Sequence, residues 1–186
     1  MKKIILLNLF CSATCHAAPE TYRIDPTHTL PRFTYNHLGY STQAGRFNQT
    51  SGTITLDRSA KTGAADIVID AKSVDMGLAI FNAKIQQEGL FDTEFFPRII
   101  FRSHDFQFDA EQIVAVHGEL TIKWVTRPVT LKVDSFLCMP HPLLKKMACG
   151  VTATTTIKRS QFGMAKYVPY VGDDITLTLP VEAIQE

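Results

Sequence analysis

The segment Val129-Thr130-Leu131-Lys132-Val133-Asp134 decides the fold class, because apolar and polar side chains alternate along it without a break. Alternation with a period of two places all the apolar side chains on one face of an extended strand. The segment 65–71 alternates in the same way. Strands of this kind are predicted at 22–24, 32–36, 44–48, 53–57, 65–71, 99–103, 120–125, 129–134, 151–159 and 175–181. So many strands, separated by glycine-containing turns, predict an antiparallel β-sandwich or barrel.

One segment of the chain departs from this pattern. Within 78–88, Leu78, Phe81 and Ile85 recur at helical spacing, and Gly89 follows as a typical helix stop. We therefore predict one amphipathic helix here, followed at 91–97 by a turn or a second short helix. A single helix lying across the end of a sheet can close a barrel.

The N-terminus predicts the compartment. Lys2 and Lys3 precede the apolar run 4–10, and Cys15-His16-Ala17 supplies small residues at the positions that a signal peptidase recognises. We predict a signal peptide at 1–17, cleaved after about Ala17, and a single mature domain at 18–186. The apolar run is too short to cross about 30 Å of hydrocarbon, so no stable membrane anchor is expected. A lipoprotein is the alternative, but neither nearby cysteine follows the Leu and small residues that such a site needs.

Charge and composition exclude some classes of partner. The chain carries 19 basic and 18 acidic residues, and loss of Lys2 and Lys3 with the signal peptide leaves a mature formal charge of −1. Nucleic acids and anionic membrane surfaces are bound by clusters of Lys and Arg, and the sequence has no such cluster. We therefore expect no nucleic-acid partner.

Two cysteines remain after processing, Cys138 and Cys149. In an oxidising compartment a lone pair of cysteines in one domain most often forms a disulfide. Metal ligation is the alternative, but only His141 lies nearby as a further ligand. We predict a structural disulfide that stabilises the fold by roughly 2–3 kcal/mol.

The residues that could support catalysis form no recognised motif. The candidates are His28, His37, His104 and His117 with Asp25, Asp92, Asp105 and Asp109. No His-x-x-x-His or His-x-His pair occurs, and Ser41 has no Gly-x-Ser-x-Gly context. His28 follows Asp25-Pro26, which favours a turn in which its ring satisfies neighbouring polar groups. We therefore expect neither an enzyme nor a metal site.

Several motifs, in order along the chain, resemble one known family. They are Asp25-Pro26-Thr27-His28-Thr29, His37-Leu38-Gly39-Tyr40-Ser41 with Gly45-Arg46-Phe47, Gly89-Leu90-Phe91-Asp92 with Phe96-Pro97, Gly118-Glu119-Leu120-Thr121-Ile122, Ile157 to Met164, and Val171-Gly172-Asp173-Asp174-Ile175. This ordered set is similar to the YceI family of periplasmic lipocalin-like proteins. It extends over essentially the whole mature chain. The cysteine pair beside His141-Pro142 resembles a disulfide-bearing branch of that family.

The resemblance implies an all-β, eight-stranded antiparallel lipocalin-like barrel with an apolar tunnel that holds a polyisoprenoid lipid, including isoprenoid quinones. It implies a periplasmic carrier whose partner is an apolar small molecule, with no cofactor besides that bound lipid. Two departures concern the tunnel: Lys84-Ile85 stands where the family often has His-Leu, and Lys123-Trp124 where a Gly often follows. A packed barrel without ligand, with a structural or stress-response role, is the alternative.

Candidate ligand-binding residues come from the presumed inward face and from the helix, since aromatic walls suit flat isoprene units. The predicted lining is Phe33, Phe47, Phe81, Ile85, Phe91, Phe101, Leu120 and Trp124. At the mouth we expect His37 and Arg46, because a guanidinium can contact a phosphate or a quinone oxygen. The sequence does not determine the headgroup. An unpaired strand edge beside the barrel seam could also support a homodimer, although no interface pattern in the sequence requires one.

Overall fold

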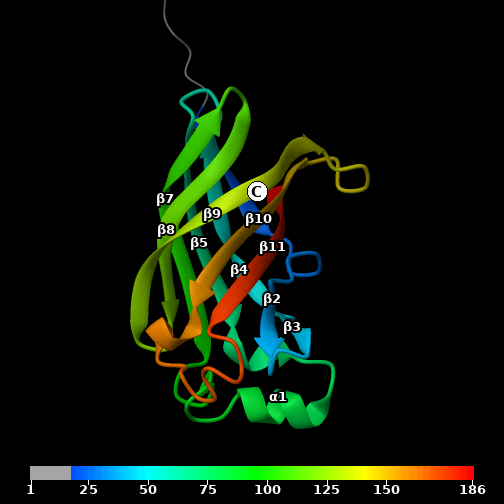
Figure 1. Cartoon of the computed structure of the whole chain (residues 1–186). Coiled ribbons are helices and arrows are strands. Elements are labelled where there is room, and N and C mark those ends of the chain that lie inside the picture. The colour runs from blue at the N-terminus through cyan, green and yellow to red at the C-terminus, as the bar shows by residue number, and fades with distance from the viewer. Residues whose placement is uncertain (1–17) are drawn as a thin grey trace, which may run out of the picture.

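The computed structural model describes residues 18–186, so the predicted signal peptide at 1–17 lies outside the described residues. Figure 1 shows an elongated β structure with one short α-helix, α1 (Ala79–Ile85), at its lower end. The segment 91–97 forms turns instead of a second α-helix. The strands are β1 (Glu20–Ile24), β2 (Arg32–His37), β3 (Ser41–Phe47), β4 (Thr50–Asp57), β5 (Thr62–Asp70), β6 (Val74–Asp75), β7 (Arg98–Asp109), β8 (Gln112–Ile122), β9 (Val125–Pro140), β10 (Met147–Lys158) and β11 (Asp174–Gln185). Two 3-10 turns are η1 (Ala71–Ser73) and η2 (Arg159–Phe162).

The sheet closes into the predicted eight-stranded antiparallel barrel. Its strands follow the order β1-β4-β5-β7-β8-β9-β10-β11, and β11 then pairs with β1. The two halves of β11 have different partners on this edge: Ala183 lies opposite Ile24 of β1, whereas Thr176 lies opposite Thr34 of β2. The strands β2, β3 and β6, which continue the sheet beyond β11, therefore extend the barrel wall only toward the lower end, where α1 lies (Figure 1).

The prediction for 120–125 was wrong at its end. Strand β8 stops at Ile122, which pairs with Val125, so Lys123 and Trp124 form a two-residue hairpin loop. Lys123 has a φ of 57°, as two-residue hairpin loops often require. Neither residue is the Gly or Asn that usually marks such a turn, and the apolar alternation continued through both. The indole of Trp124 consequently does not share the inward face of Leu120 and Ile122.

Two clusters of buried side chains fill the barrel unequally. The upper cluster lies on the side away from α1 and includes Tyr22, Leu56, Val116 and Ala183, with Tyr22 only 1% exposed. The lower cluster lies toward α1, and Phe162 is its most buried large side chain at 1% exposed. Side chains of the lower cluster surround a hollow, and no residue of the upper cluster lines it.

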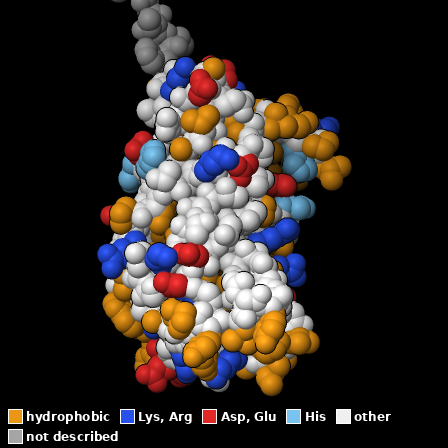
Figure 2. Space-filling view, in the orientation of Figure 1, with side chains coloured by type: hydrophobic (Ala, Val, Ile, Leu, Met, Phe, Trp, Pro, Cys, Tyr) orange, Lys and Arg blue, Asp and Glu red, His pale blue; other side chains and the backbone are white. Residues whose placement is uncertain are grey.

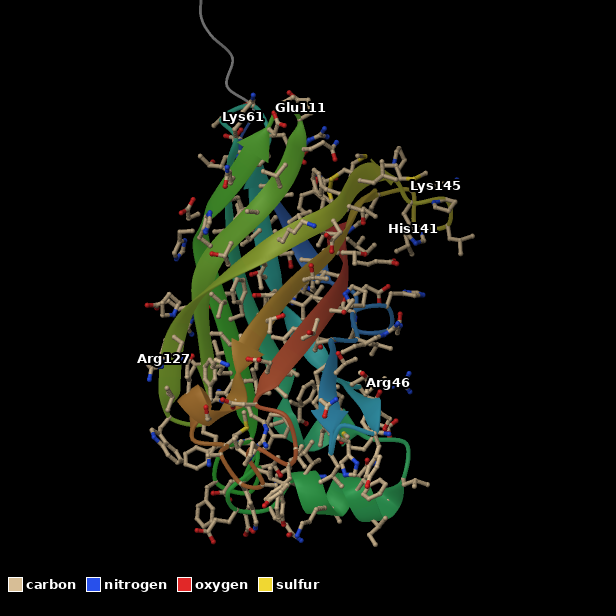
Figure 3. The ribbon with its side chains drawn as sticks, viewed as in Figure 1. Arg46, Lys61, Glu111, Arg127, His141 and Lys145 are labelled. Atoms are coloured by element: carbon tan, nitrogen blue, oxygen red, sulfur yellow. A yellow bond between two sulfur atoms is a disulfide. The ribbon has the colours of Figure 1, made fainter. Side chains whose placement is uncertain are left out.

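The predicted disulfide is present. Cys138 of β9 and Cys149 of β10 are directly opposite in the ladder and joined at an S–S distance of 2.01 Å. Cys149 belongs to the upper cluster. The disulfide therefore fixes the hairpin that projects at the upper right of Figure 1, whose loop carries His141 and Lys145 (Figure 3).

Within residues 18–186, no helix combines the length and apolar character that a bilayer crossing would need.

Candidate ligand cavity

The lower half of the barrel contains a cavity of about 630 Å³. Its wall combines inward positions of β2, β3, β8, β10 and β11 with α1 and the loops that follow α1 and η2. The volume lies within the range of about 300–1,000 Å³ that is typical of small-molecule sites. The accessible lining is far more apolar than polar, so the cavity suits a hydrocarbon-rich ligand.

Helix α1 covers the cavity at the lower end. Leu78, Phe81 and Ile85, which recur at helical spacing, line the cavity, yet the helix has no fully buried residue. Phe81 is 53% exposed. A helix of this length is not stable alone, and Asn82 fixes its start by accepting a hydrogen bond from the Met76 amide at 2.6 Å. The apolar face of α1 thus borders open space instead of a dense core.

Three phenylalanines form an aromatic wall. The ring centroids of Phe33 and Phe47 are 5.7 Å apart, and Phe91 lies 6.3 Å from Phe33 and 5.5 Å from Phe47. Gly45 makes this packing possible, because a Cβ at that position would lie 2.4 Å from the Phe33 ring. The sequence motif that contains Gly45 is therefore explained by the close approach of Phe33.

Arg159 is a charged group in the cavity wall and is only 6% exposed. Its Nε donates to Gly172 O at 2.9 Å and its Nη2 to Val171 O at 2.7 Å. Its Nη1 donates to Lys166 O at 2.8 Å and also to Met164 O. Burial lowers the pKa of the Arg159 guanidinium. Four carbonyl groups thus accept hydrogen bonds from most of the N–H donors of the Arg159 guanidinium, and these bonds hold the 164–172 segment against the barrel.

Further polar side chains stand around the opening. Lys84, Lys166, Tyr167 and His37 line the cavity, and both lysines are exposed. Lys84 Nζ lies 5.4 Å from the centroid of the Tyr167 ring. A hydrogen bond with Lys84 lowers the pKa of the Tyr167 hydroxyl. Figure 2 shows apolar side chains gathered at the same lower end, with Lys or Arg side chains among them.

The structure brings most of the predicted site residues together. The residues that line the cavity are Phe33, His37, Phe47, Phe81, Ile85, Phe91 and Leu120. Arg46, Phe101 and Trp124 do not. Arg46 is adjacent to the inward Phe47 on β3, so it points outward, where it forms an ion pair with Asp75 at 3.7 Å (Figure 3). Phe101 packs against both core clusters, at the boundary between the filled half and the hollow half.

Sequence reasoning missed the polar lining residues Tyr35, Arg159, Lys84 and Lys166. Tyr35 was recoverable, because it alternates with Phe33 on the same face of β2. Arg159 follows Ile157 on the inward face at the end of β10, but a charged side chain is normally assigned to solvent. The two lysines depend on how α1 and the 164–172 segment pack, which strand periodicity does not describe.

Trp124 lies outside the cavity and is 63% exposed. Its ring centroid is 5.0 Å from that of Phe96, and Lys123 Nζ lies 4.4 Å from the indole. We expect Trp124→Ala to leave the affinity for a hydrophobic probe within about twofold of the original, because no lining contact is lost. Displacement fluorimetry measures this, and a tenfold loss would place the indole in the binding site after all.

Among the residues considered for catalysis, His28 lies in a turn with Asp25, as predicted. His28 Nδ1 lies 2.7 Å from Asp25 Oδ2, and Asp25 Oδ1 accepts from the Thr27 amide at 2.8 Å. Glu182 Oε2 lies 4.0 Å from His28 Nδ1. Asp25, His28 and Glu182 are close enough to hold a cation. His28 and Glu182 are exposed, Asp25 is partly buried, and the contact between His28 and Asp25 is internal to the turn. Partial burial opposes ionisation of Asp25, yet hydrogen bonds from Thr27 and His28 outweigh it and lower the pKa of the carboxyl.

The hydrogen bond with Asp25 raises the pKa of His28 above its ordinary value. Because the folded-state pKa is raised, the bond stabilises the fold fully below the unfolded-state pKa, and this contribution is lost as pH rises through the folded-state pKa. We expect Asp25→Asn to shift the His28 pKa downward in an NMR titration of the ring protons. Superimposable titration curves for the two proteins would contradict the pairing.

The protein is thus an eight-stranded antiparallel barrel with an apolar cavity, and comparison with known proteins gives the family. A model of the YceI-like domain matches residues 22–183, so the chain belongs to the YceI-like domain family. Protein YceI of Escherichia coli O157:H7 is 30% identical over 194 residues that cover 100% of both chains.

Solved structures share the fold. The crystal structure of Burkholderia cenocepacia BcnA superimposes with a TM-score of 0.73 at 21% identity, covering 86% of this chain and 98% of BcnA. A polyisoprenoid binding domain from Saccharophagus degradans, implicated in plant cell wall breakdown, gives a TM-score of 0.68 at 16% identity, with 89% and 98% covered. At these identities the likeness establishes the barrel architecture.

Proposed function

We propose that this protein is a periplasmic carrier that binds an isoprenoid lipid, either a polyprenyl phosphate or an isoprenoid quinone, in the cavity at the lower end of the barrel. The observation that carries the proposal is an apolar space of about 630 Å³ where a packed barrel would have side chains. The structural relative from Saccharophagus degradans, described as a polyisoprenoid binding domain, supports the ligand class.

The energetics favour a ligand of this kind. Each apolar CH₂ group removed from water contributes about 0.8 kcal/mol, so a few isoprene units outweigh the cost of ordering the ligand. Phe33, Phe47 and Phe91 offer flat surfaces for those units. The filled upper half of the barrel limits the length of tail that can be enclosed.

The compartment is part of the same proposal. The disulfide between Cys138 and Cys149 is typical of proteins that fold in an oxidising environment. The predicted signal peptide at 1–17 would deliver the chain there. Shielding an isoprenoid tail from water is a task that arises wherever such lipids leave the membrane.

Titration of delipidated protein with geranylgeraniol tests the binding function. We expect the alcohol to displace the neutral fluorophore Nile red with a 1:1 end point. If geranylgeraniol displaces Nile red equally well from the Phe81→Asp variant and from the original protein, the assigned cavity is contradicted. If no isoprenoid of C15 to C20 displaces the probe, the binding function is contradicted.

A further inference from the structure

The charged groups that line the cavity all have the same sign. They are Arg32, Lys84, Arg159 and Lys166, with His37 as a further basic group, and no Asp or Glu of residues 18–186 lines it. The mature chain carries nearly equal numbers of acidic and basic residues, so the composition does not cause this segregation. A cavity for a neutral ligand has no need of it.

Arg159 retains a donor that the protein does not use. One N–H of its Nη2 has no hydrogen-bond partner among the described residues, and no carboxylate there lies within ion-pair distance. Asp173, whose charge acts on Arg159, instead accepts hydrogen bonds from the amide and hydroxyl of Ser160. A buried cation without a counter-ion costs free energy that a bound anion would offset.

Tyr35 supplies a second unused polar group beside Arg159. Its hydroxyl has no hydrogen-bond partner in the part of the chain that the structure describes, and its side chain lines the cavity. The side chains of Tyr35 and Arg159 line the same cavity, and an electrostatic interaction links them. A phenol and a guanidinium in the wall of one cavity can both donate to one oxyanion.

We propose that the cavity selects an acidic amphiphile whose phosphate or carboxylate headgroup binds Arg159 and Tyr35, with Lys84 and Lys166 adding positive charge at the opening. The inference rests on the proposed function and narrows it, because it favours a prenyl phosphate over a neutral quinone. The hydrocarbon part of the ligand packs against the aromatic wall and α1. A neutral headgroup would leave the guanidinium without a counter-ion.

Ligands that share a tail and differ in the headgroup test the proposal. We compare farnesyl phosphate with farnesol on delipidated protein, using Nile red displacement at low ionic strength. The acid should bind at least tenfold more tightly, and added salt should narrow the difference. Equal affinities would overturn this inference and leave the carrier function intact, whereas absence of binding by both compounds would overturn both.

A second series identifies the acidic group. Dodecyl phosphate and dodecanoate are each compared with dodecanol, so that phosphate and carboxylate can be ranked on one tail. Tighter binding of either acid than of the alcohol supports the proposal, and the acid that binds more tightly identifies the headgroup. If dodecanol binds as tightly as both acids, the proposal is contradicted.

Variants connect the preference to the named side chains. Tyr35→Phe and the double variant Lys84→Gln/Lys166→Gln should each reduce the ratio of farnesyl phosphate to farnesol affinity severalfold. Lys72→Gln removes an exposed lysine that does not line the cavity, and it should leave the ratio unchanged. Arg159→Met should abolish the ratio. If that variant fails to fold, the other two decide, and an unchanged ratio in both would contradict the site.

Discussion

Replacement of Phe81 by Asp is expected to weaken lipid binding at least tenfold while the barrel stays folded. Phe81 lines the cavity from α1 but is 53% exposed, so the substitution removes no densely packed core contact. A carboxylate at this position lies against the hydrocarbon of the ligand, and burial of an unpaired charge is unfavourable by several kcal/mol. Displacement of Nile red by geranylgeraniol measures the change.

The neighbouring Ile80 provides a matched control. It belongs to the same helix and is 73% exposed, but it does not line the cavity. Ile80→Asp adds the same charge to the same helix and should retain the original affinity within about twofold. Equal losses in the two variants would show that α1 acts through its stability or its charge, and would contradict the assignment of Phe81 to the ligand wall.

Removal of the disulfide is expected to lower the free energy of unfolding by about 3 kcal/mol, because the bridge closes a short loop in the unfolded chain. Cys138 and Cys149 are separated by 11 positions in the sequence and link β9 to β10. Neither cysteine lines the cavity. The double variant Cys138→Ser/Cys149→Ser should therefore unfold at lower urea concentration and bind lipid with little change.

Two comparisons control for side effects of the serines. Reduction of the original protein with dithiothreitol should give a similar loss of stability. Met139→Ser replaces the exposed neighbour of Cys138 and should alter stability by less than about 0.5 kcal/mol. A double variant as stable as the original would show that the bridge makes no contribution to the fold.

Strand periodicity predicted most of the barrel because burial on one face imposes a period of two. The segment 129–134 lies within β9, and the predicted strand 65–71 coincides with β5 from Ala65 to Asp70, whereas β5 begins at Thr62. The pattern failed at Lys123-Trp124, where a two-residue turn carries an apolar side chain that alternation assigns to the core. Nothing local distinguishes that indole from a lining residue, since its position depends on packing against Phe96.

The apolar part of the site was more predictable than its polar part. Phe33, Phe47 and Leu120 follow from alternation, and Phe81 and Ile85 from helical spacing. Arg159 could not be assigned in this way, because its burial depends on the carbonyl groups that the 164–172 segment presents to it. Arg46 shows the opposite case. Its guanidinium suits a ligand headgroup, but the side chain points away from the cavity, because Phe47 takes the inward position on β3.

Native mass spectrometry of the protein purified in mild buffer from its own cells tests the central claim most directly. The account predicts one additional mass per polypeptide, removed by organic solvent and identified in the extract as a molecule with an isoprenoid tail. A spectrum that contains only the bare polypeptide, with no extractable lipid, would contradict the claim that the cavity holds a lipid.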